Sequence, residues 1–255
     1  MKFTKTLLTT ALFSLSILSA SQMAYAVSEQ ETQLQQGLEA AGRGDFATAL
    51  QLWKPLAEHG YAQAQYNLGV MYENGDEVEQ DDFQAFKWYQ KAAEQGYAPA
   101  QLNFGYMYHN GQGVKQDYFQ AVKWYQKAAE QGDAQAQYNL GGMYYEGQEV
   151  KQDYFQAFKW YQKAAEQGHA DAQFNLALMY DDGQGVKQDH FQAFKWYQKA
   201  AEQGDAGAQV ILGSMYYLGE GVKQDRNLAK MWAGKACENG KQNGCDMYRM
   251  LNEGK

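Results

Sequence analysis

Small and apolar residues recur along this chain with the spacing of amphipathic helices, and the whole pattern returns every 36 residues. Within residues 134–145, such residues stand three or four positions apart, which predicts a helix that we name A. A second helix, named B, is predicted from the residue after Asp153 to about Gln167, and apolar residues occupy most of its circumference. A polar stripe remains on helix B and is predicted to face water; it consists of Gln156, Lys159, Lys163 and Glu166.

One sequence segment recurs along the chain in near-identical copies. Residues 151–168 read KQDYFQAFKWYQKAAEQG, and near-copies stand at residues 79–96, 115–132 and 187–204. Tryptophan keeps the same step, at Trp88, Trp124, Trp160, Trp196 and Trp232. A fixed period between 20 and 50 residues is typical of a solenoid, in which each unit buries its apolar faces only against its neighbours. We therefore predict an all-α solenoid, in which the sequence repeats because each unit packs against its neighbours in the same way.

The apolar residues of helix B define the expected contacts. Phe155, Phe158, Tyr161 and Ala165 lie along one side, which we expect the unit's own helix A and that of the next unit to cover. The tryptophans at period 36 are interpreted in the same way, as core side chains rather than ligand sites.

Capping residues mark the ends of both helices. Helix A ends at Gly147, and Asp153 suits the N-cap of helix B, with Gln156 three residues later as in a capping box. Helix B stops at Gly168, where a left-handed C-cap favours glycine.

The first residues have the features of a leader. Lys2 and Lys5 precede an apolar stretch over residues 7–18, and the small-residue sequence Ala-Tyr-Ala ends at Ala26. This order is typical of a signal peptide cleaved after Ala26. The alternative, a transmembrane anchor, is disfavoured because the apolar run is short and interrupted by Thr and Ser. We expect four segments: a signal peptide at 1–26, an N-terminal helical cap at 27–59, five repeats at 60–239 and a C-terminal cap helix at 240–255.

The net negative charge of the chain disfavours some classes of partner. Without the leader the chain holds 20 basic and 30 acidic residues, a net charge of −10 that repels nucleic acid and anionic lipid. No later stretch reaches the length of a membrane span, so no membrane insertion is expected after cleavage. Cys237 and Cys245 make a disulfide plausible in an oxidising compartment, either the periplasm or the extracellular space.

Residues suited to catalysis are scarce. After the leader the chain has two serines, Ser28 and Ser214, and neither stands in a Ser-x-x-Lys or Gly-x-Ser-x-Gly sequence. The four histidines fall at unrelated positions of the repeat, and no two are four residues apart. We therefore expect no catalytic residues, no metal site and no cofactor.

The repeat resembles a known family. Helix A carries Ala-x-Ala-Gln-x-x-Leu-Gly-x-Met-Tyr within residues 134–147, and helix B carries Ala-x-x-Trp-Tyr-x-Lys-Ala within residues 157–168. This pattern is similar to the Sel1-like repeat family, while residues 29–60 look more like the related tetratricopeptide repeat. The resemblance implies a right-handed superhelix of helix pairs, with a concave face lined by A helices. It also implies scaffold or adaptor work rather than a reaction.

Two alternatives stay open beside the scaffold. Some secreted members of the family have a disulfide in each repeat and are connected with penicillin binding or β-lactam hydrolysis, which keeps a hydrolase of β-lactams or peptidoglycan as an alternative. Only the pair Cys237 and Cys245 follows that pattern here. The second alternative is a secreted factor that acts on a host cell.

The positions at which the repeats differ predict the binding site. Shared residues cannot make a selective surface, so selectivity requires the variable positions of helix A, which fall on one helix face. By resemblance to tetratricopeptide repeats this face binds a protein or peptide, and the asparagines on it either bind the peptide backbone or link repeats. Asp181 and Asp182 form an acidic end that favours a basic segment. The predicted groove comprises Tyr66, Asn67, Asn103, Tyr106, His109, Tyr138, Asn139, Tyr145, Phe174, Asn175, Leu178, Asp181, Asp182 and Tyr217.

Overall fold

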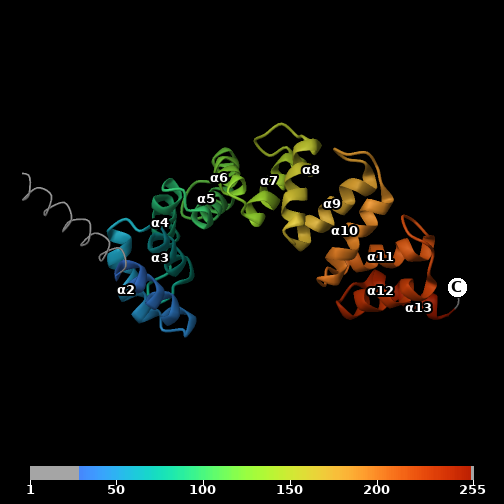
Figure 1. Cartoon of the computed structure of the whole chain (residues 1–255), viewed down its shortest axis with the longest axis horizontal. Coiled ribbons are helices and arrows are strands. Elements are labelled where there is room, and N and C mark those ends of the chain that lie inside the picture. The colour runs from blue at the N-terminus through green and yellow to red at the C-terminus, as the bar shows by residue number, and fades with distance from the viewer. Residues whose placement is uncertain (1–28, 254–255) are drawn as a thin grey trace, which may run out of the picture. The chain divides into compact units, whose positions relative to one another are not determined.

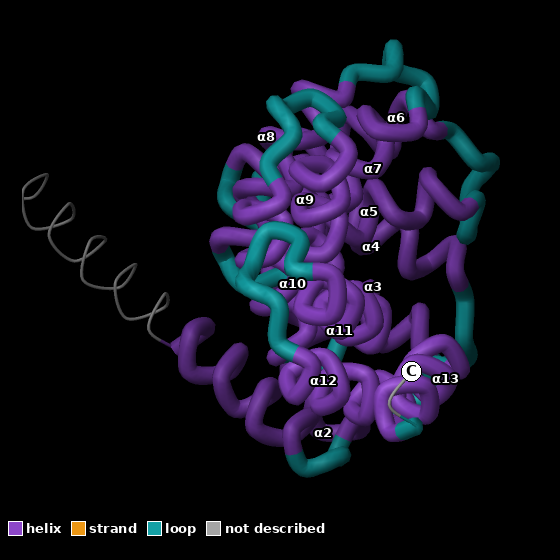
Figure 2. Tube along the Cα trace, turned by 90° about the vertical axis from the view of Figure 1, so that its right-hand side faces the viewer, coloured by secondary structure: helices purple, strands orange, loops and turns teal. Residues whose placement is uncertain are grey.

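The structure is a computed structural model that describes residues 29–253, and these residues form helices and connecting loops with no strand among them (Figures 1 and 2). The predicted signal peptide lies outside the described residues. A first helix covers residues 29–42. It is followed by α2 (Phe46–Glu58), α3 (Ala62–Asn74), α4 (Asp82–Glu94), α5 (Ala98–Asn110), α6 (Tyr118–Glu130), α7 (Ala134–Glu146), α8 (Tyr154–Glu166), α9 (Ala170–Asp182), α10 (His190–Glu202), α11 (Ala206–Leu218), α12 (Arg226–Glu238) and α13 (Gln242–Asn252).

The predicted helix pairs are present. The A helices are α3, α5, α7, α9 and α11, and the B helices are α4, α6, α8, α10 and α12. None of the described helices has the length and apolar character that a membrane span needs. The fold class is therefore the predicted one, an all-α solenoid of repeated helix hairpins.

The helix ends also agree with the sequence. The Asp153 carboxylate accepts a hydrogen bond from the Gln156 backbone N–H at 3.0 Å and so caps α8. Gly147 ends α7 in the left-handed conformation, and Gly168 follows α8 with a φ of 92°. The last helix, α13, lies within the segment 240–255 that was predicted as the C-terminal cap.

The chain forms two compact units. The first comprises the residues up to Ala100 together with Gln112–Val114, and the second comprises Gln101–Gly111 with the residues from Lys115 onward. In the first unit, the Trp53 indole N–H donates to the Leu34 carbonyl at 3.3 Å and joins the first described helix to α2. The same core continues into α3, so the N-terminal hairpin covers the first repeat.

A buried glutamine joins consecutive repeats. Gln137, near the start of α7, is only 4% exposed. Its amide N–H donates to the Ala129 carbonyl of α6 at 3.1 Å, and its oxygen accepts from the Gln167 side chain beyond α8 at 2.8 Å. One side chain thus connects three helices of two repeats. The equivalent glutamines that bond a carbonyl of the preceding helix are Gln65, Gln173 and Gln209.

The prediction that Phe155 packs against helix A is wrong. Phe155 is 54% exposed, whereas Ala157 is fully buried. Residues two apart on an α-helix point about 160° apart, so Phe155 lies away from the buried side of α8. Phe158 does pack, with its ring 5.2 Å from that of Tyr180. The same exposed position recurs in the other near-copies, at Phe83, Phe119 and Phe191.

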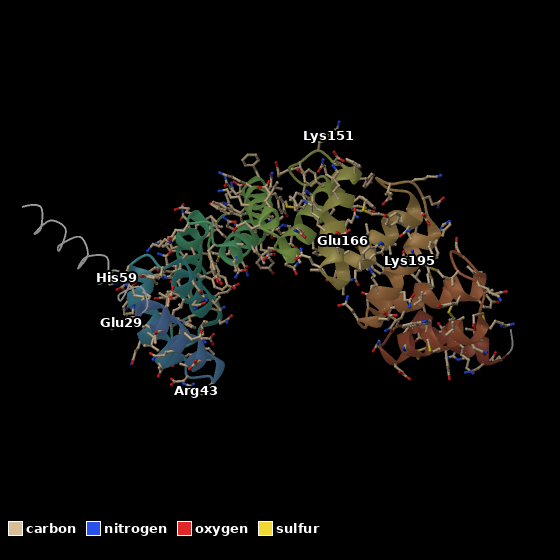
Figure 3. All side chains as sticks on the ribbon, in the orientation of Figure 1. Glu29, Arg43, His59, Lys151, Glu166 and Lys195 are labelled. Carbon is tan, nitrogen blue, oxygen red and sulfur yellow. A yellow bond between two sulfur atoms is a disulfide. The ribbon has the colours of Figure 1, made fainter. Side chains whose placement is uncertain are left out.

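Lysine side chains lie over these exposed rings. The Lys159 ammonium lies 4.2 Å from the centre of the Phe155 ring, and Lys163 lies 4.1 Å from that of Trp160. Both lysines are exposed, as the predicted polar stripe requires. Lys151, in the loop between α7 and α8, extends away from the helices (Figure 3).

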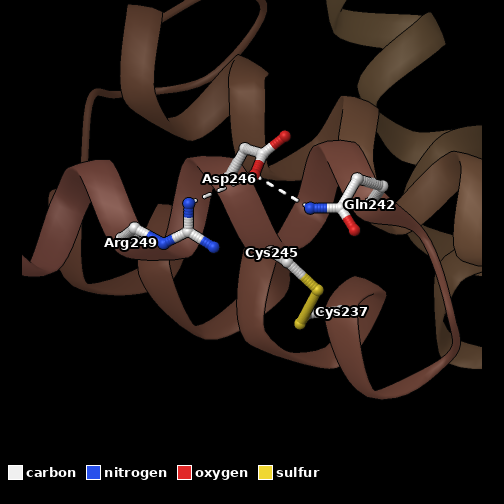
Figure 4. Close-up of a disulfide and its surroundings, with 5 residues drawn as sticks. All are labelled: Cys237, Gln242, Cys245, Asp246 and Arg249. Atoms are coloured by element: carbon white, nitrogen blue, oxygen red, sulfur yellow. Dashed lines mark hydrogen bonds and ion pairs between the residues drawn. A yellow bond between two sulfur atoms is a disulfide. The ribbon is translucent and has the colours of Figure 1, made fainter.

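The C-terminal cap is held by the predicted disulfide (Figure 4). Cys237 near the end of α12 is bonded to Cys245 on α13, with their Cα atoms 4.5 Å apart. On the exposed side of α13, the Asp246 carboxylate accepts from the Gln242 amide at 2.9 Å and lies 3.7 Å from the Arg249 guanidinium. The disulfide therefore links the last B helix to the capping helix.

We predict that Gln137→Ala destabilises the protein by about 1–3 kcal/mol, because a buried side chain and its hydrogen bonds to the Ala129 carbonyl and the Gln167 amide are lost together. The matched control is Gln162→Ala, which removes a partly exposed glutamine of α8 that bonds only within its own helix and should change stability by less than about 0.5 kcal/mol. Urea unfolding followed by circular dichroism measures both. Equal midpoints for the two variants would contradict the structural role of Gln137.

Reduction of the disulfide should loosen α13 first. The loop that it closes is short, and chain entropy gives about 2–3 kcal/mol for its closure. The end of a solenoid has a neighbour on one side only, so the loss falls there. Hydrogen exchange of the oxidised and reduced protein should show faster exchange in α13 and unchanged exchange in α7. Unchanged protection of α13 after reduction would refute the prediction.

Candidate functional site

A pocket of about 470 Å³ opens on the A helices of the second, third and fourth repeats, entirely within the C-terminal unit. Its wall comes from α5, α6, α7, α8 and α9 and from the loop after α7. The lining residues are Tyr106, His109, Asn110, Tyr125, Tyr138, Asn139, Gly142, Met143, Tyr145, Glu146, Gln148, Tyr161, Asn175 and Leu178.

The pocket contains half of the predicted groove residues. Those that line it are Tyr106, His109, Tyr138, Asn139, Tyr145, Asn175 and Leu178. Sequence reasoning missed Tyr125 and Tyr161, because it assigned the tyrosines of helix B to the core. It also missed Glu146, which is the last residue of α7. The tyrosines were missed because only the A helices were treated as a source of the surface, whereas Glu146 was missed although it stands on an A helix.

Gly142 explains the position of the pocket. The equivalent residues of the other repeats have side chains, namely Val70, Tyr106, Leu178 and Ser214. A Cβ atom at Gly142 would lie 3.6 Å from the Tyr161 hydroxyl, which is an ordinary contact distance. A longer side chain there would extend into the space. The third repeat is therefore the one in which the groove deepens into a pocket.

Ring contacts fix the tyrosines of the wall. Tyr161 packs on the backbone of Gly141, where a Cβ atom would lie only 2.7 Å from the ring. The Tyr138 ring lies 5.7 Å from Tyr161 and stacks on His169 at 4.7 Å. On the other side, the Tyr145 hydroxyl donates to the Gln184 amide oxygen at 2.9 Å. The aromatic wall is thus held in place by neighbouring groups.

Asparagines bond the tyrosine hydroxyls. Asn139 hydrogen-bonds the Tyr125 hydroxyl, and Asn175 hydrogen-bonds those of Tyr138 and Tyr161. Burial raises the pKa of all three phenols, so they stay neutral at physiological pH. Asn139 and Asn175 therefore make bonds between repeats, one of the two roles that the sequence left open.

The fifth repeat shows what happens without the asparagine. Ile211 stands 36 residues after Asn175, at the equivalent position of the next repeat. Tyr197 is likewise the equivalent of Tyr161, and its hydroxyl is buried without a hydrogen-bond partner. In the first repeat, Asn67 is itself buried, and its amide nitrogen has no partner. The asparagine positions thus differ in their surroundings from repeat to repeat.

Two ionisable side chains line the pocket. Burial lowers the pKa of His109 although the Glu146 carboxylate opposes this shift, and the buried Nδ1 atom of His109 has no hydrogen-bond partner. The imidazole is therefore neutral at pH 7. Glu146 is exposed, and the Gln148 amide donates to its carboxylate. The pocket thus has one permanent charge, which is negative.

The other predicted residues lie outside this pocket. Asp181 accepts a hydrogen bond from the imidazole of His190 at 2.7 Å, and this bond raises the pKa of His190. The Asp181 carboxylate thus already has a partner within the chain, whereas Asp182 is exposed. Phe174 packs against Tyr197, with the ring centres 5.7 Å apart.

The remaining predicted positions have their own neighbours. Tyr66 lies between Tyr89 and Tyr97 in the N-terminal unit, with ring centres 5.7 and 5.4 Å away. Tyr217 lies under the guanidinium of Arg226 at 5.7 Å. Asn103 is partly buried. None of these three predicted positions contributes to the pocket wall.

The groups considered for catalysis are placed as follows. The Ser214 hydroxyl donates to the Val210 carbonyl at 3.2 Å, and Ser28 lies outside the described residues. Within residues 29–253, no three His, Cys, Asp or Glu side chains are grouped as a metal site requires. The site is therefore described by its tyrosines, asparagines and single carboxylate.

Solved structures share the fold. The crystal structure of c5321, described as a protective antigen of uropathogenic Escherichia coli with an SLR fold, is 39% identical with a TM-score of 0.82. That alignment covers 89% of this chain and 50% of the antigen, so the chain spans about half of the antigen's length. A Sel1 repeat protein from Oxalobacter formigenes is 35% identical with a TM-score of 0.77, over 85% of this chain and 86% of that protein. No curated protein matches the chain.

The family model agrees with the helix pairs. The Sel1 repeat model matches residues 62–97, 98–133, 134–169, 170–205 and 206–241. Each matched segment contains one A helix and the B helix that follows it. With five consecutive matches over most of its length, this chain belongs to the Sel1 repeat family.

Proposed function

We propose that this chain is an exported, non-enzymatic scaffold that binds a protein or peptide partner of the cell envelope on its A-helix face. One observation carries the proposal: the pocket is lined at Tyr106, Gly142 and Leu178 by residues that differ between repeats. The residues that the repeats share, such as Gln137, serve packing instead. A surface of variable residues on a repeated frame suits selective binding.

The composition of the pocket supports a protein ligand. Tyrosine is among the residues that contribute most to binding energy at protein interfaces, and five tyrosines line this space. Tyr106 is 48% exposed in the free protein. The volume of about 470 Å³ suits side chains of a bound segment rather than a large cofactor. Sel1 repeat proteins typically serve as scaffolds for protein interaction, in agreement with this proposal.

Export rests on two features. The predicted signal peptide opens the sequence, and the Cys237–Cys245 disulfide fits an oxidising compartment. The similarity to c5321, a protective antigen, favours the extracellular alternative of a host-interaction factor as the second candidate. Both candidates use the same binding face and differ in the compartment of the partner.

Binding should depend on the tyrosines of the pocket. We expect Tyr106→Ala combined with Tyr145→Ala to abolish capture of the partner, because truncation of an aromatic anchor typically costs about 2 kcal/mol or more. The matched control is Lys123→Ala combined with Lys159→Ala on the exposed B-helix surface. Cross-linking in living cells from residue 110, followed by mass spectrometry, measures capture. Loss of the partner only in the lysine variant would place the site on the wrong face.

Export predicts a defined N-terminus. The protein recovered from the envelope or the medium should begin at Val27, and both cysteines should resist alkylation before reduction. N-terminal sequencing and mass spectrometry of each cell fraction measure these properties, and also separate the periplasmic from the extracellular candidate. Recovery of the uncleaved chain with free thiols from the cytoplasm would refute the export part of the proposal.

A further inference from the structure

We propose that the pocket is an aromatic cage for a cationic side chain, lysine or arginine, of the bound partner. This inference rests on the proposed function and assigns the chemistry that the site recognises. Tyr106, Tyr138 and Tyr145 supply the accessible rings, the buried Tyr125 and Tyr161 complete the lining, and Glu146 supplies the negative charge.

The charge of the pocket supports a cation. Glu146 is the one acidic residue that lines the pocket, and burial lowers the pKa of His109, which keeps that imidazole neutral. Its carboxylate acts across the pocket: it opposes the lowered pKa of His109 and contributes to the raised pKa of Tyr138 and Tyr161. The whole chain is also acidic, with a formal net charge of −8, which attracts positively charged partners.

The tyrosines that line the pocket belong to different helices. Tyr106 lies on α5, Tyr125 on α6, Tyr138 and Tyr145 on α7, and Tyr161 on α8. The planes of Tyr138 and Tyr161 are inclined by 42° to each other. Electron-rich rings around one space attract an ammonium or guanidinium group through the ring quadrupoles. Neighbouring contacts hold Tyr138, Tyr145 and Tyr161 in the free protein, so these side chains lose little conformational freedom on binding.

The Glu146 carboxylate disfavours other occupants. It suits a ligand that donates hydrogen bonds, as lysine and arginine do. An apolar side chain would cover this carboxylate without compensation. An anion would meet the Glu146 carboxylate, and no lysine or arginine lines the pocket to balance it. A cationic donor satisfies the carboxylate.

Short peptides test the inference directly. The probes are acetyl-Gly-Arg-Gly-amide, its lysine analogue, its citrulline analogue, which is neutral and nearly isosteric, and its glutamate analogue. NMR titration of the purified protein gives each dissociation constant. We expect the arginine and lysine peptides to bind at least about tenfold more tightly than the citrulline peptide, and the glutamate peptide not to bind.

Three variants place the effect in the pocket. Glu146→Gln should remove the preference for arginine over citrulline, while the charge-matched Glu166→Gln, on the exposed side of α8, should keep it (Figure 3). Gly142→Leu should weaken the arginine peptide at least about tenfold by filling the space. Leucine is a better helix former than glycine, so this variant tests the cavity without disfavouring the fold.

The outcomes separate this inference from the proposed function. Equal affinity for arginine and citrulline, absence of pocket shifts with every peptide, or a preference that survives Glu146→Gln would overturn the cationic cage. The binding face itself fails under a different result, namely capture of the cellular partner by the variant with Tyr106→Ala and Tyr145→Ala. A protein that loses its partner in that variant but treats arginine and citrulline alike keeps the binding face and loses the cage.

Discussion

The solenoid depends on a buried amide that satisfies two groups at once. Each junction between repeats brings the end of a B helix against the start of the next A helix. The carbonyl there accepts from a backbone N–H of the turn, as Ala129 does from Gly132 at 3.1 Å, and the buried glutamine adds a second hydrogen bond to it. Gln137 meets the carbonyl of Ala129 and, in its own repeat, holds the side chain of Gln167. The last repeat uses Asn239 in place of that second glutamine, bonded to Gln209 at 2.9 Å. Consecutive hairpins are therefore joined by directional bonds in addition to apolar contact.

Because shared residues hold the repeats together, other positions are free to differ. Tyr161 packs on Gly141 and supports the frame, yet its hydroxyl also reaches the pocket beside Gly142. Asn175 combines the same two roles, since it bonds tyrosine hydroxyls while it lines the space. A division of residues into core and surface does not apply to this wall. The binding surface consists of the inner ends of core side chains, exposed where a neighbouring position is small.

The sequence predicts the helices better than the site. Period, capping residues and glycines determine helix ends locally, which is why the end of α7 at Gly147 and the cap at Asp153 agree with the prediction. Burial is not a local property. Phe155 was assigned to the core because it is apolar, and only its angular position relative to Ala157 shows that it faces out. The contact between Asp181 and His190 likewise joins a helix A to the following helix B, and no rule of residue spacing predicts such a contact.

The loop after α7 differs from the loops after α9 and α11, and it shares this difference with the first repeat, where Glu77 has a φ of 57°. Gly185 and Gly221 approach the preceding repeat so closely that a Cβ atom would lie 2.2 Å from a backbone oxygen. Glu149 occupies the equivalent position of the third repeat with a φ of 53° and carries a side chain. The side chain of Glu149 thus stands where these glycines have none. Gln148, its neighbour in the chain, lines the pocket. The first repeat shares the glutamate but has Val70 at the position of Gly142, so the missing side chain at Gly142 distinguishes the third repeat at the pocket.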